Sequence, residues 1–485
     1  MLPMYVKYMG VEAYGLVGFF AMLSAWFQLL DAGLTPTMSR EAARYNAGAL
    51  DALTLRRLLR SLEGIFCLVA IFACGAMILT SNSIATKWLR VQQLPLAEVE
   101  SAIVLMAFII SFRFISGLYR GSISGLERLV WLSNFNIVLA TLRFVIVIPY
   151  FWFVGASPVD FFAYQLVIGI VDLVLLASKA YSLLPKPAMA TQSGWQWAPI
   201  RNVLKFSLSI GFTSTVWVLI TQTDKLVLSK LLPLADYAYF TLAVVLASGV
   251  ILIGGPISAA LLPRMTSLNA ARNAPELIRV YRTATQCVSI VAVPAVAVLA
   301  FFSEDILRVW TGNATIAGKA SELLTLYSLG NGFLALAAFP YYLQFAKGNL
   351  RLHLIGNAVF ALFLIPSVIW ATLNYGASGA GWAWLANNAV CFLLWVPFVH
   401  RQFVPGLHVK WLLGDILPIS GLALGSAYII QMSLSLSNDR LTAGLQLAVV
   451  SLAVFVAGAL GSSWLKGLVS QHHNARGTER VSSDE

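Results

Sequence analysis

Long apolar segments recur along almost the whole chain, and this pattern sets the class of fold. A helix of roughly 20 apolar residues spans a lipid bilayer, and 13 segments of about that length lie between Gly15 and Leu465. Only 11% of the residues are charged, whereas a soluble domain is about a quarter charged. The chain is therefore expected to be an all-α polytopic membrane protein. The segments lie at about residues 15–37, 61–80, 101–119, 131–153, 160–184, 203–222, 237–259, 284–302, 321–343, 352–373, 376–398, 412–432 and 443–465.

The basic residues are distributed unevenly between alternate loops. When the loop at 40–60 is placed inside, the inner loops hold 22 of the 32 Lys and Arg residues and the outer loops hold 8. This bias follows the positive-inside rule. It predicts a multi-pass protein of the cytoplasmic (inner) membrane with a cytoplasmic C-terminus. The basic residues behind the net charge of +11 thus set the orientation in the membrane and attract anionic lipid. Nucleic-acid binding is a poor interpretation of this charge.

The composition of the loops suggests two lobes. The first lobe comprises residues 1–184 with five spans, and a cytoplasmic linker follows at 185–202 that is rich in Pro and Trp. The second lobe comprises 203–398 with six spans. Two further spans fill 399–465, and the polar tail 466–485 is expected to be disordered.

A faint repeat relates the two lobes. Glu12 and Arg40 bracket one apolar stretch, and Asp236 and Arg264 bracket another, with an offset of 224 residues at both ends. Chance similarity between apolar segments is the alternative explanation. If the repeat is genuine, the first lobe lacks one helix relative to the second, with an opening beside segment 15–37. Either the true start lies upstream and supplies that helix, or the lobe is open to lipid on one side.

Several chemical classes have no support in the sequence. The chain has no GxxxxGK[ST] phosphate-binding loop, which argues against nucleotide hydrolysis. The four Cys lie within spans, the five His show no metal-ligand spacing, and no nucleophile–base pair is visible. We therefore expect no enzymatic activity, no metal and no cofactor. A transport function would be driven by the substrate's own gradient or by H⁺ or Na⁺ as the coupling ion.

Charged residues inside a membrane are costly and usually have a function. Four stand out within spans, and all of these are in the first lobe: Asp31, Arg113, Arg143 and Asp172. At 1.5 Å per residue, Arg143 and Asp172 are each roughly 18 Å into their spans and close to the midplane. They either form a structural ion pair, or Arg113 and Arg143 line a water-filled cavity that binds an anionic headgroup. Asp31 and Asp172 would then be counter-charges and candidate sites for the coupling ion.

Two neighbouring charges lie at the expected outer end of span 203–222. Asp224 and Lys225 either cap that helix end at the membrane interface, or Lys225 faces the opening between the lobes. In the second case Lys225 joins Arg113 and Arg143 as a candidate substrate-binding residue.

Three short segments resemble one family of membrane proteins. The sequence LLDAGL at 29–34 followed by Arg40, the pair YRGS at 119–122 and GLER at 125–128, and TDKLVLSK at 223–230 are similar to segments of bacterial polysaccharide and O-antigen flippases. These Wzx-like proteins belong to the multidrug/oligosaccharidyl-lipid/polysaccharide (MOP) exporter superfamily. By this resemblance, the following residues lie in family motifs: Asp31, Gly33, Arg40, Tyr119, Arg120, Gly121, Arg128, Asp224 and Lys225.

The resemblance implies a function as well as a fold. Such proteins have two lobes around a central cavity and work by alternating access. They move undecaprenyl-pyrophosphate-linked sugars from the inner to the outer leaflet, for lipopolysaccharide or exopolysaccharide synthesis. Their implied partners are the lipid-linked oligosaccharide, a polysaccharide polymerase and the chain-length machinery.

Three alternative functions predict different features in the sequence. A multidrug exporter predicts an acidic cavity for cationic drugs. A membrane-embedded polymerase or ligase needs a large outer loop with catalytic residues, and the sequence has none of that length. A flippase for peptidoglycan precursors predicts a more cationic cavity that extends across both lobes.

Overall fold

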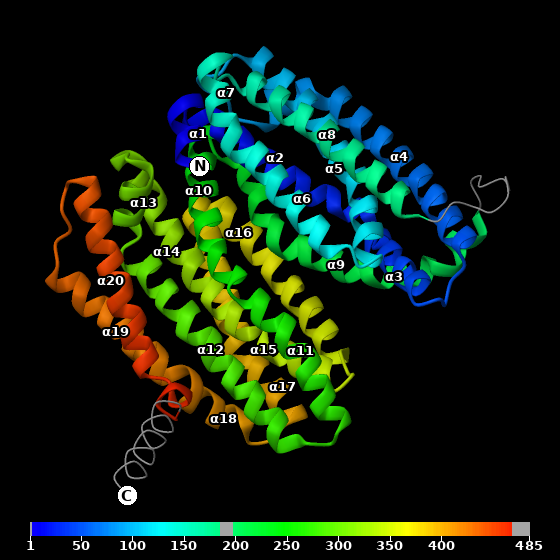
Figure 1. Ribbon diagram of the computed structural model, residues 1–485. Coiled ribbons are helices and arrows are strands. Elements are labelled where there is room, and N and C mark those ends of the chain that lie inside the picture. The colour runs from blue at the N-terminus through cyan, green and yellow to red at the C-terminus, as the bar shows by residue number, and fades with distance from the viewer. Residues whose placement is uncertain (1, 185–196, 468–485) are drawn as a thin grey trace, which may run out of the picture. The chain divides into compact units, whose positions relative to one another are not determined.

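The computed structural model describes residues 2–184 and 197–467, and its secondary structure is helical (Figure 1). Eleven helical segments in that part of the chain are long and apolar enough to cross a membrane. The expected all-α polytopic class is therefore confirmed. One of these segments, Arg351–Phe403, contains two expected spans, and segment 203–222 lies in a helix outside the eleven. The total of 13 spans stays a prediction.

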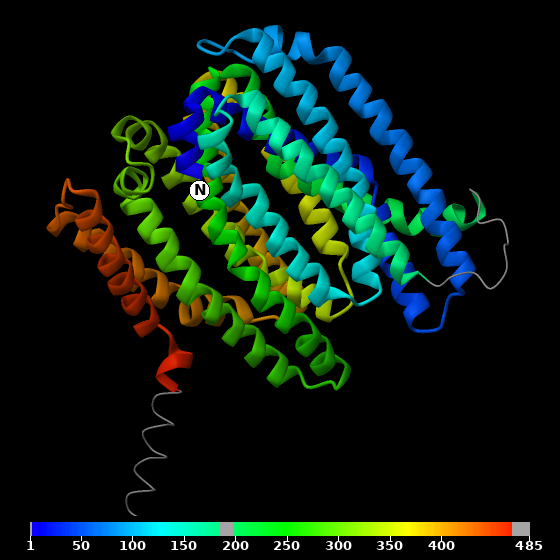
Figure 2. The same ribbon diagram turned by 45° about the horizontal axis from the view of Figure 1, so that its top comes forward.

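The chain divides into two compact units, Met1–Ala238 and Tyr239–Glu485. The helices of each unit run side by side (Figures 1 and 2). The helices of the first unit are α1 (Leu2–Met9), α2 (Val11–Phe27), η1 (Gln28–Asp31), α3 (Leu34–Asn46), α4 (Ala52–Ser83), η2 (Ile84–Trp88), α5 (Leu96–Gly125), α6 (Leu129–Thr141), η3 (Leu142–Ile146), α7 (Val147–Phe153), α8 (Pro158–Leu183) and α9 (Trp197–Leu231).

Helix α5 is the centre of the first unit, because it packs against α3, α4 and α8. Small residues on α5 permit the close approach of α3: a Cβ on Gly125 would lie 2.0 Å from the carbonyl oxygen of Ser39. Helix α8 begins with a capping box in which Ser157 and Asp160 bind each other's backbone N–H groups, an arrangement that satisfies free donors at a helix start.

Helix α9 packs against α2, α3 and α4 of the first unit. A Cβ on Gly33 would lie 2.3 Å from the carbonyl oxygen of Ser207, and one on Gly211 would lie 2.6 Å from the carbonyl carbon of Ala32. The hydroxyls of Thr37 and Ser207 form a hydrogen bond of 2.7 Å. Helix α9 therefore occupies the place beside segment 15–37 where the sequence led us to expect an opening.

The boundaries expected for the lobes differ from this packing. Helix α9 was expected to begin the second lobe at residue 203, but its contacts place it in the first unit, and the division falls at Ala238. The end of the expected linker, 197–202, is already helical. The rest of that linker and residues 468–485 of the expected tail lie outside the described residues.

Helix α10 (Leu234–Leu252) crosses the boundary between the units. The helices of the second unit are α11 (Gly254–Ala270), α12 (Ala274–Phe301), α13 (Ser303–Thr311), α14 (Ala314–Ala337), α15 (Phe339–Ala346), α16 (Arg351–Val390), η4 (Cys391–Trp395), α17 (Val396–Phe403), α18 (Leu407–Trp411), η5 (Leu412–Ile416), α19 (Leu417–Ser433) and α20 (Arg440–Leu460).

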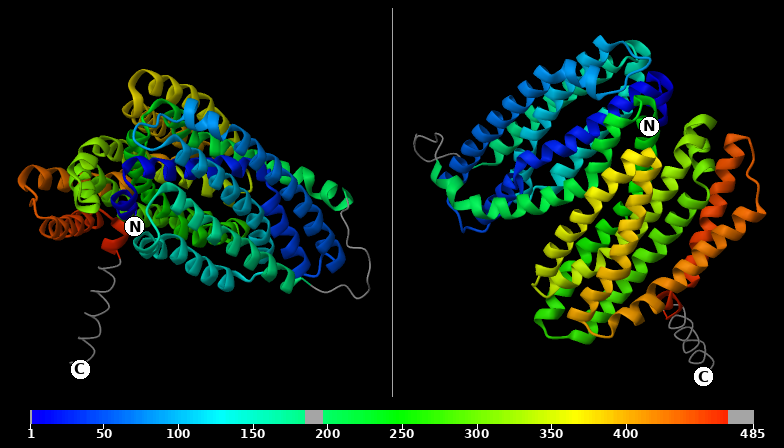
Figure 3. Two further views of the ribbon diagram at one scale, coloured as in Figure 1. Left: turned by 90° about the horizontal axis from the view of Figure 1, so that it is seen from above. Right: turned by 180° about the vertical axis from the view of Figure 1, so that it is seen from behind.

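The second unit is organised around α12, which contacts α11, α14, α19 and α20. The last two helices, α19 and α20, lie side by side in both views of Figure 3. Helix α16 contains a sharp bend at Gly376, whose φ of +61° favours glycine because a Cβ is strained there. This bend is the turn that the small-residue run at 376–381 predicts, so segments 352–373 and 376–398 form a hairpin.

Candidate functional site

A cationic cavity of about 260 Å³ lies within the first unit. Its polar lining comes from three neighbouring parts of the bundle. Helix α5 contributes Arg113 and Arg120, α6 and η3 contribute Asn136 and Arg143, and α8 contributes Asp172. The apolar lining consists of Leu139, Ala140 and Phe144. The cavity thus brings together two expected substrate-binding residues, Arg113 and Arg143, the expected counter-charge Asp172 and the motif residue Arg120.

Helical periodicity explains why these side chains meet. Arg113 and Arg120 are seven residues apart on α5, and Asn136 and Arg143 are seven apart on the next helix. Seven residues make nearly two turns of a helix, so each pair lies on one face. The second pair spans the start of η3, a single π-helical turn. Such turns are frequent at functional sites.

Asp172 is the centre of the ion-pair network in this cavity. Its side chain is only 2% exposed. Its Oδ1 accepts a hydrogen bond of 2.7 Å from Nη2 of Arg120, and its Oδ2 accepts one of 2.9 Å from Nη2 of Arg143. The Arg143–Asp172 pair that the sequence suggested is therefore present, with Arg120 as a second partner. Arg120 also donates to the side-chain oxygen of Asn136.

Arg113 differs from the other two arginines because no ion pair among the described residues includes it. Its guanidinium lies 4.8 Å from the ring centre of Phe20 on α2. Its Nε has no hydrogen-bond partner among the described residues, and the same is true of Nε of Arg143. Three guanidiniums and one carboxylate leave the cavity with a formal charge of +2. The arrangement can bind an anion, since a guanidinium fork suits two-point contact with phosphate or carboxylate oxygens.

Asp31 lies outside this cavity. It is the last residue of η1, and its Oδ1 accepts hydrogen bonds from the backbone N–H of Thr35 at 3.0 Å and from its hydroxyl at 2.6 Å. It therefore satisfies donors at the start of α3. Gly33, with a φ of +76°, follows in the same turn. In the structure, the motif at 29–34 forms a tight turn that packs against α9. A role of Asp31 in binding the coupling ion stays a prediction.

Asp224 and Lys225 also lie outside the cavity. Helix α9 does not end near residue 222, as the sequence led us to expect, but continues to Leu231. Within it, Nζ of Lys225 lies 3.3 Å from Oδ1 of Asp224 and donates to the backbone carbonyl of Thr221. The pair therefore lies within α9 rather than at its end, and its location at the membrane interface stays a prediction. Binding of substrate by Lys225 stays a prediction.

The first half of the motif at 119–128 belongs to α5, which continues to Gly125. Tyr119 donates to Oε1 of Glu63 at 2.9 Å. A Cβ on Gly121 would lie 2.6 Å from the carbonyl oxygen of Thr35. Arg128 is exposed just before α6. The motif therefore shapes the contact between α3 and α5, while Arg120 turns into the cavity.

The remaining motif residue, Arg40, lies on α3, where its Nη1 is 3.8 Å from Oε1 of Glu41. Three contacts were not anticipated from the sequence: Arg120 with Asp172, Arg120 with Asn136, and Arg113 with Phe20. The seven-residue spacing within each helix is the signal that would have placed Arg120 and Asn136 on the cavity face. No comparable signal exists for Phe20, because its contact depends on how α2 packs. In the described part of the chain, no group of three His, Cys, Asp or Glu side chains could hold a metal ion.

Comparison with known proteins gives a family match and a fold match. A family model described as "polysaccharide biosynthesis protein" matches residues 1–269, which include the whole arginine cavity. No curated protein matches the chain.

Solved structures show the same fold. An inward-facing multidrug resistance MATE family transporter of the MOP superfamily has a TM-score of 0.69 and 15% identity, and the match covers 83% of this chain and 93% of that one. A MATE protein in the straight conformation has a TM-score of 0.55 and 13% identity, with 83% and 90% covered. An outward-facing MATE transporter has a TM-score of 0.52 and 15% identity, with the same coverage of 83% and 90%. The chain therefore has a MATE-like fold.

Proposed function

This chain belongs to the polysaccharide biosynthesis protein family, and from that premise we propose that it translocates lipid-linked oligosaccharides. The cargo would be a polysaccharide repeat unit on undecaprenyl pyrophosphate, moved from the inner to the outer leaflet of the cytoplasmic membrane by alternating access. The C-terminus lies in the cytoplasm in this proposal, and a polysaccharide polymerase receives the product. The substrate is transported without a chemical step, so the protein is not an enzyme.

The observation that carries this proposal is the positive charge of the cavity between α5, η3 and α8. A pyrophosphate headgroup is an anion with several oxygen acceptors, and it complements a site with a formal charge of +2. Asp172 holds the guanidiniums of Arg120 and Arg143 at 2.7 and 2.9 Å, which orients them before substrate arrives. Arg113 has no ion-pair partner among the described residues and is the arginine available to bind phosphate oxygens directly.

The same charge argues against a multidrug exporter. A cationic drug in this cavity would face three guanidiniums and a single carboxylate that already accepts from two of them. Like charges at close range in a poorly hydrated site repel strongly. The similarity to multidrug transporters is a similarity of fold at 13–15% identity, and a fold hosts different substrates on different sites.

A charged cavity also needs a physical reason to persist. An arginine within a membrane span is destabilising unless it faces a partner or a water-filled space. Asp172 compensates only one of the three positive charges. Binding of an anionic substrate supplies that reason. We further propose that transport is driven by H⁺ or Na⁺, with Asp31 or Asp172 as the residue that binds the coupling ion.

The experiment measures flipping in proteoliposomes that contain the purified full chain. The substrate is undecaprenyl pyrophosphate with a short fluorescent oligosaccharide, and a membrane-impermeant reductant bleaches the fluorophore in the outer leaflet. The matched control is the same polyprenol and oligosaccharide joined without phosphate, and a cationic dye tests drug export. We expect flipping of the pyrophosphate lipid alone. Equal flipping of the neutral lipid, or transport of the dye alone, would overturn the proposal.

A further inference from the structure

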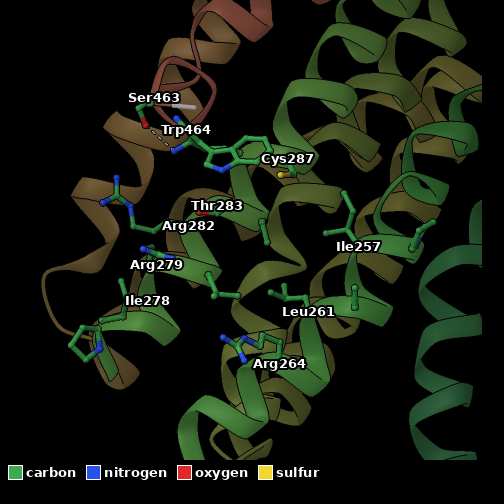
Figure 4. A pocket seen from close by; sticks show the side chains of 17 residues that line it. Ile257, Leu261, Arg264, Ile278, Arg279, Arg282, Thr283, Cys287, Ser463 and Trp464 are labelled. Atoms are coloured by element: carbon green, nitrogen blue, oxygen red, sulfur yellow. Dashed lines mark hydrogen bonds between the residues drawn. The ribbon is translucent and has the colours of Figure 1, made fainter. Parts of the chain in front are cut away.

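A second, larger cavity lies within the second unit, far along the sequence from the arginine cavity. Its volume is about 1010 Å³, and its walls come from α11, α12 and the segment that follows α20. Figure 4 shows three arginines around it: Arg264 in the second half of α11, and Arg279 and Arg282 on α12. No role in oligosaccharide transport accounts for this cavity, because the substrate site proposed above lies within the first unit.

The three arginines differ in how much of their charge is compensated. Arg282 makes a two-point contact with Asp415, with its Nε 2.6 Å from Oδ2 and its Nη2 2.9 Å from Oδ1. Arg279 lies 3.1 Å from Glu276, but its side chain is 77% exposed, so this pair contributes little. Arg264 is exposed, and no ion pair among the described residues includes it. The rim of the cavity is therefore positive.

A buried polar network builds the wall that carries Trp464. Nε2 of Gln286 donates to Asp415 at 2.6 Å and to the hydroxyl of Ser463 at 2.9 Å. Oε1 of Gln286 accepts from the hydroxyl of Ser462 at 2.6 Å and from the backbone N–H of Trp464 at 3.0 Å. The network fixes the chain after α20 to α12. The indole of Trp464 consequently lies at the cavity (Figure 4), and Trp is the residue typical of membrane–water interfaces.

The opposite side of the cavity is apolar. Ile257 and Leu261 on α11 line it, and Figure 4 shows both on the side away from Arg282. The surface thus places a cationic rim next to an aliphatic wall. The loop that joins α11 and α12 lies on the inner side by the charge distribution, since four Lys and Arg residues fall within 264–282.

We propose that this cavity binds an anionic phospholipid of the inner leaflet. The phosphodiester lies against Arg264 and Arg279, and an acyl chain lies along Ile257 and Leu261. A soluble phosphate would need the cationic rim but not the aliphatic wall, whereas a phospholipid uses both. Because it touches α11, α12 and Trp464, the lipid links the core of the second unit to its C-terminal helices. The site is independent of the proposed transport function.

The test is a titration of the detergent-purified full chain followed by native mass spectrometry. Phosphatidylglycerol, phosphatidylcholine and soluble glycerol phosphate are compared as probes. We expect retained phosphatidylglycerol on the wild type and little of the other two. Each arginine near an anionic lipid surface contributes roughly fivefold to affinity. The double variant Arg264→Gln with Arg279→Gln should therefore lose about thirtyfold in affinity for phosphatidylglycerol.

Arg351→Gln is the matched control, because Arg351 is exposed on the same predicted side and does not line the cavity. It should retain wild-type affinity. A second measurement on the wild type uses a photoactivatable phosphatidylglycerol, which should label peptides within 256–287 and 463–467. Equal retention of phosphatidylcholine, equal binding of glycerol phosphate, an equal loss in the control, or labelling elsewhere would overturn the proposal.

Discussion

Replacement of Arg113 by Gln separates substrate binding from structure more cleanly than any other change in the arginine cavity. The reason is its lack of an ion-pair partner among the described residues, while Arg120 and Arg143 both bind Asp172. Removal of either of those two would disturb the network around Asp172 as well as the site. Removal of Arg113 leaves that network intact and lowers the formal charge of the cavity from +2 to +1.

The expected magnitudes follow from the contacts. A hydrogen bond to a charged group contributes about 1.5–3 kcal/mol, so loss of the guanidinium should raise the KM for the pyrophosphate lipid about 10- to 150-fold. The folded state loses a cation–π contact with Phe20 of about 0.5–2 kcal/mol. It also loses a partly buried guanidinium whose Nε has no hydrogen-bond partner among the described residues. This second loss favours the folded state, because burial of an unpaired polar group is costly. These effects oppose each other, so the melting temperature should stay close to that of the wild type.

The assay measures initial flipping rates against substrate concentration in proteoliposomes, together with thermal unfolding of the same preparations. Arg113→Lys should fall between the wild type and Arg113→Gln, because it keeps the charge but loses the planar fork. Arg90→Gln is the control, since Arg90 is an exposed arginine of the same unit outside the cavity. An unchanged KM in Arg113→Gln would refute the binding role, and a melting temperature far below the wild type would show that Arg113 is structural.

Three further variants test the fold and its electrostatics. Asp172→Asn removes the carboxylate that Arg120 and Arg143 share, so we expect a loss of about 3–5 kcal/mol in unfolding free energy; wild-type stability in denaturant titrations would contradict the network. In Gly33→Ala the new Cβ would be strained by a φ of +76° and would also lie 2.3 Å from the carbonyl oxygen of Ser207. In Gly48→Ala the φ of +74° is similar, but no heavy atom lies within 4 Å of the new Cβ. The first should lower the melting temperature and the second much less, and equal effects would show that the contact with α9 does not matter. Asp51 accepts a hydrogen bond from Thr54 at the start of α4, and this bond lowers its pKa. The carboxylate therefore stabilises the fold above the unfolded pKa of about 4 and ceases to do so as the pH falls through the lower folded value. Asp51→Ala should cost about 1 kcal/mol at pH 7 and less at pH 3, and a loss independent of pH would refute the cap.

The positions of the spans were predictable because the signal for them is local. A run of about 20 apolar residues is visible without knowledge of its neighbours, and the helices observed follow the expected segments within several residues at most ends. The hairpin at Gly376 was predictable for the same reason. The end of α9 was not predictable in this way. Asp224 and Lys225 form an ion pair within the helix, and the helix continues past them to Leu231.

The sequence alone determined the membrane class, the bias of positive charge between alternate loops, and the presence of charged residues within apolar spans, since each of these depends only on composition along the chain. Only the tertiary structure decided that Asp172 binds both Arg120 and Arg143, that Arg113 lies over Phe20 with no ion-pair partner among the described residues, and that α9 packs beside the turn at Gly33. These outcomes depend on the rotation of helices about their axes, on the π-helical turn at η3, and on close contacts between backbones. The sum of such contacts across distant segments, rather than any local pattern, determines which of these charged side chains form ion pairs.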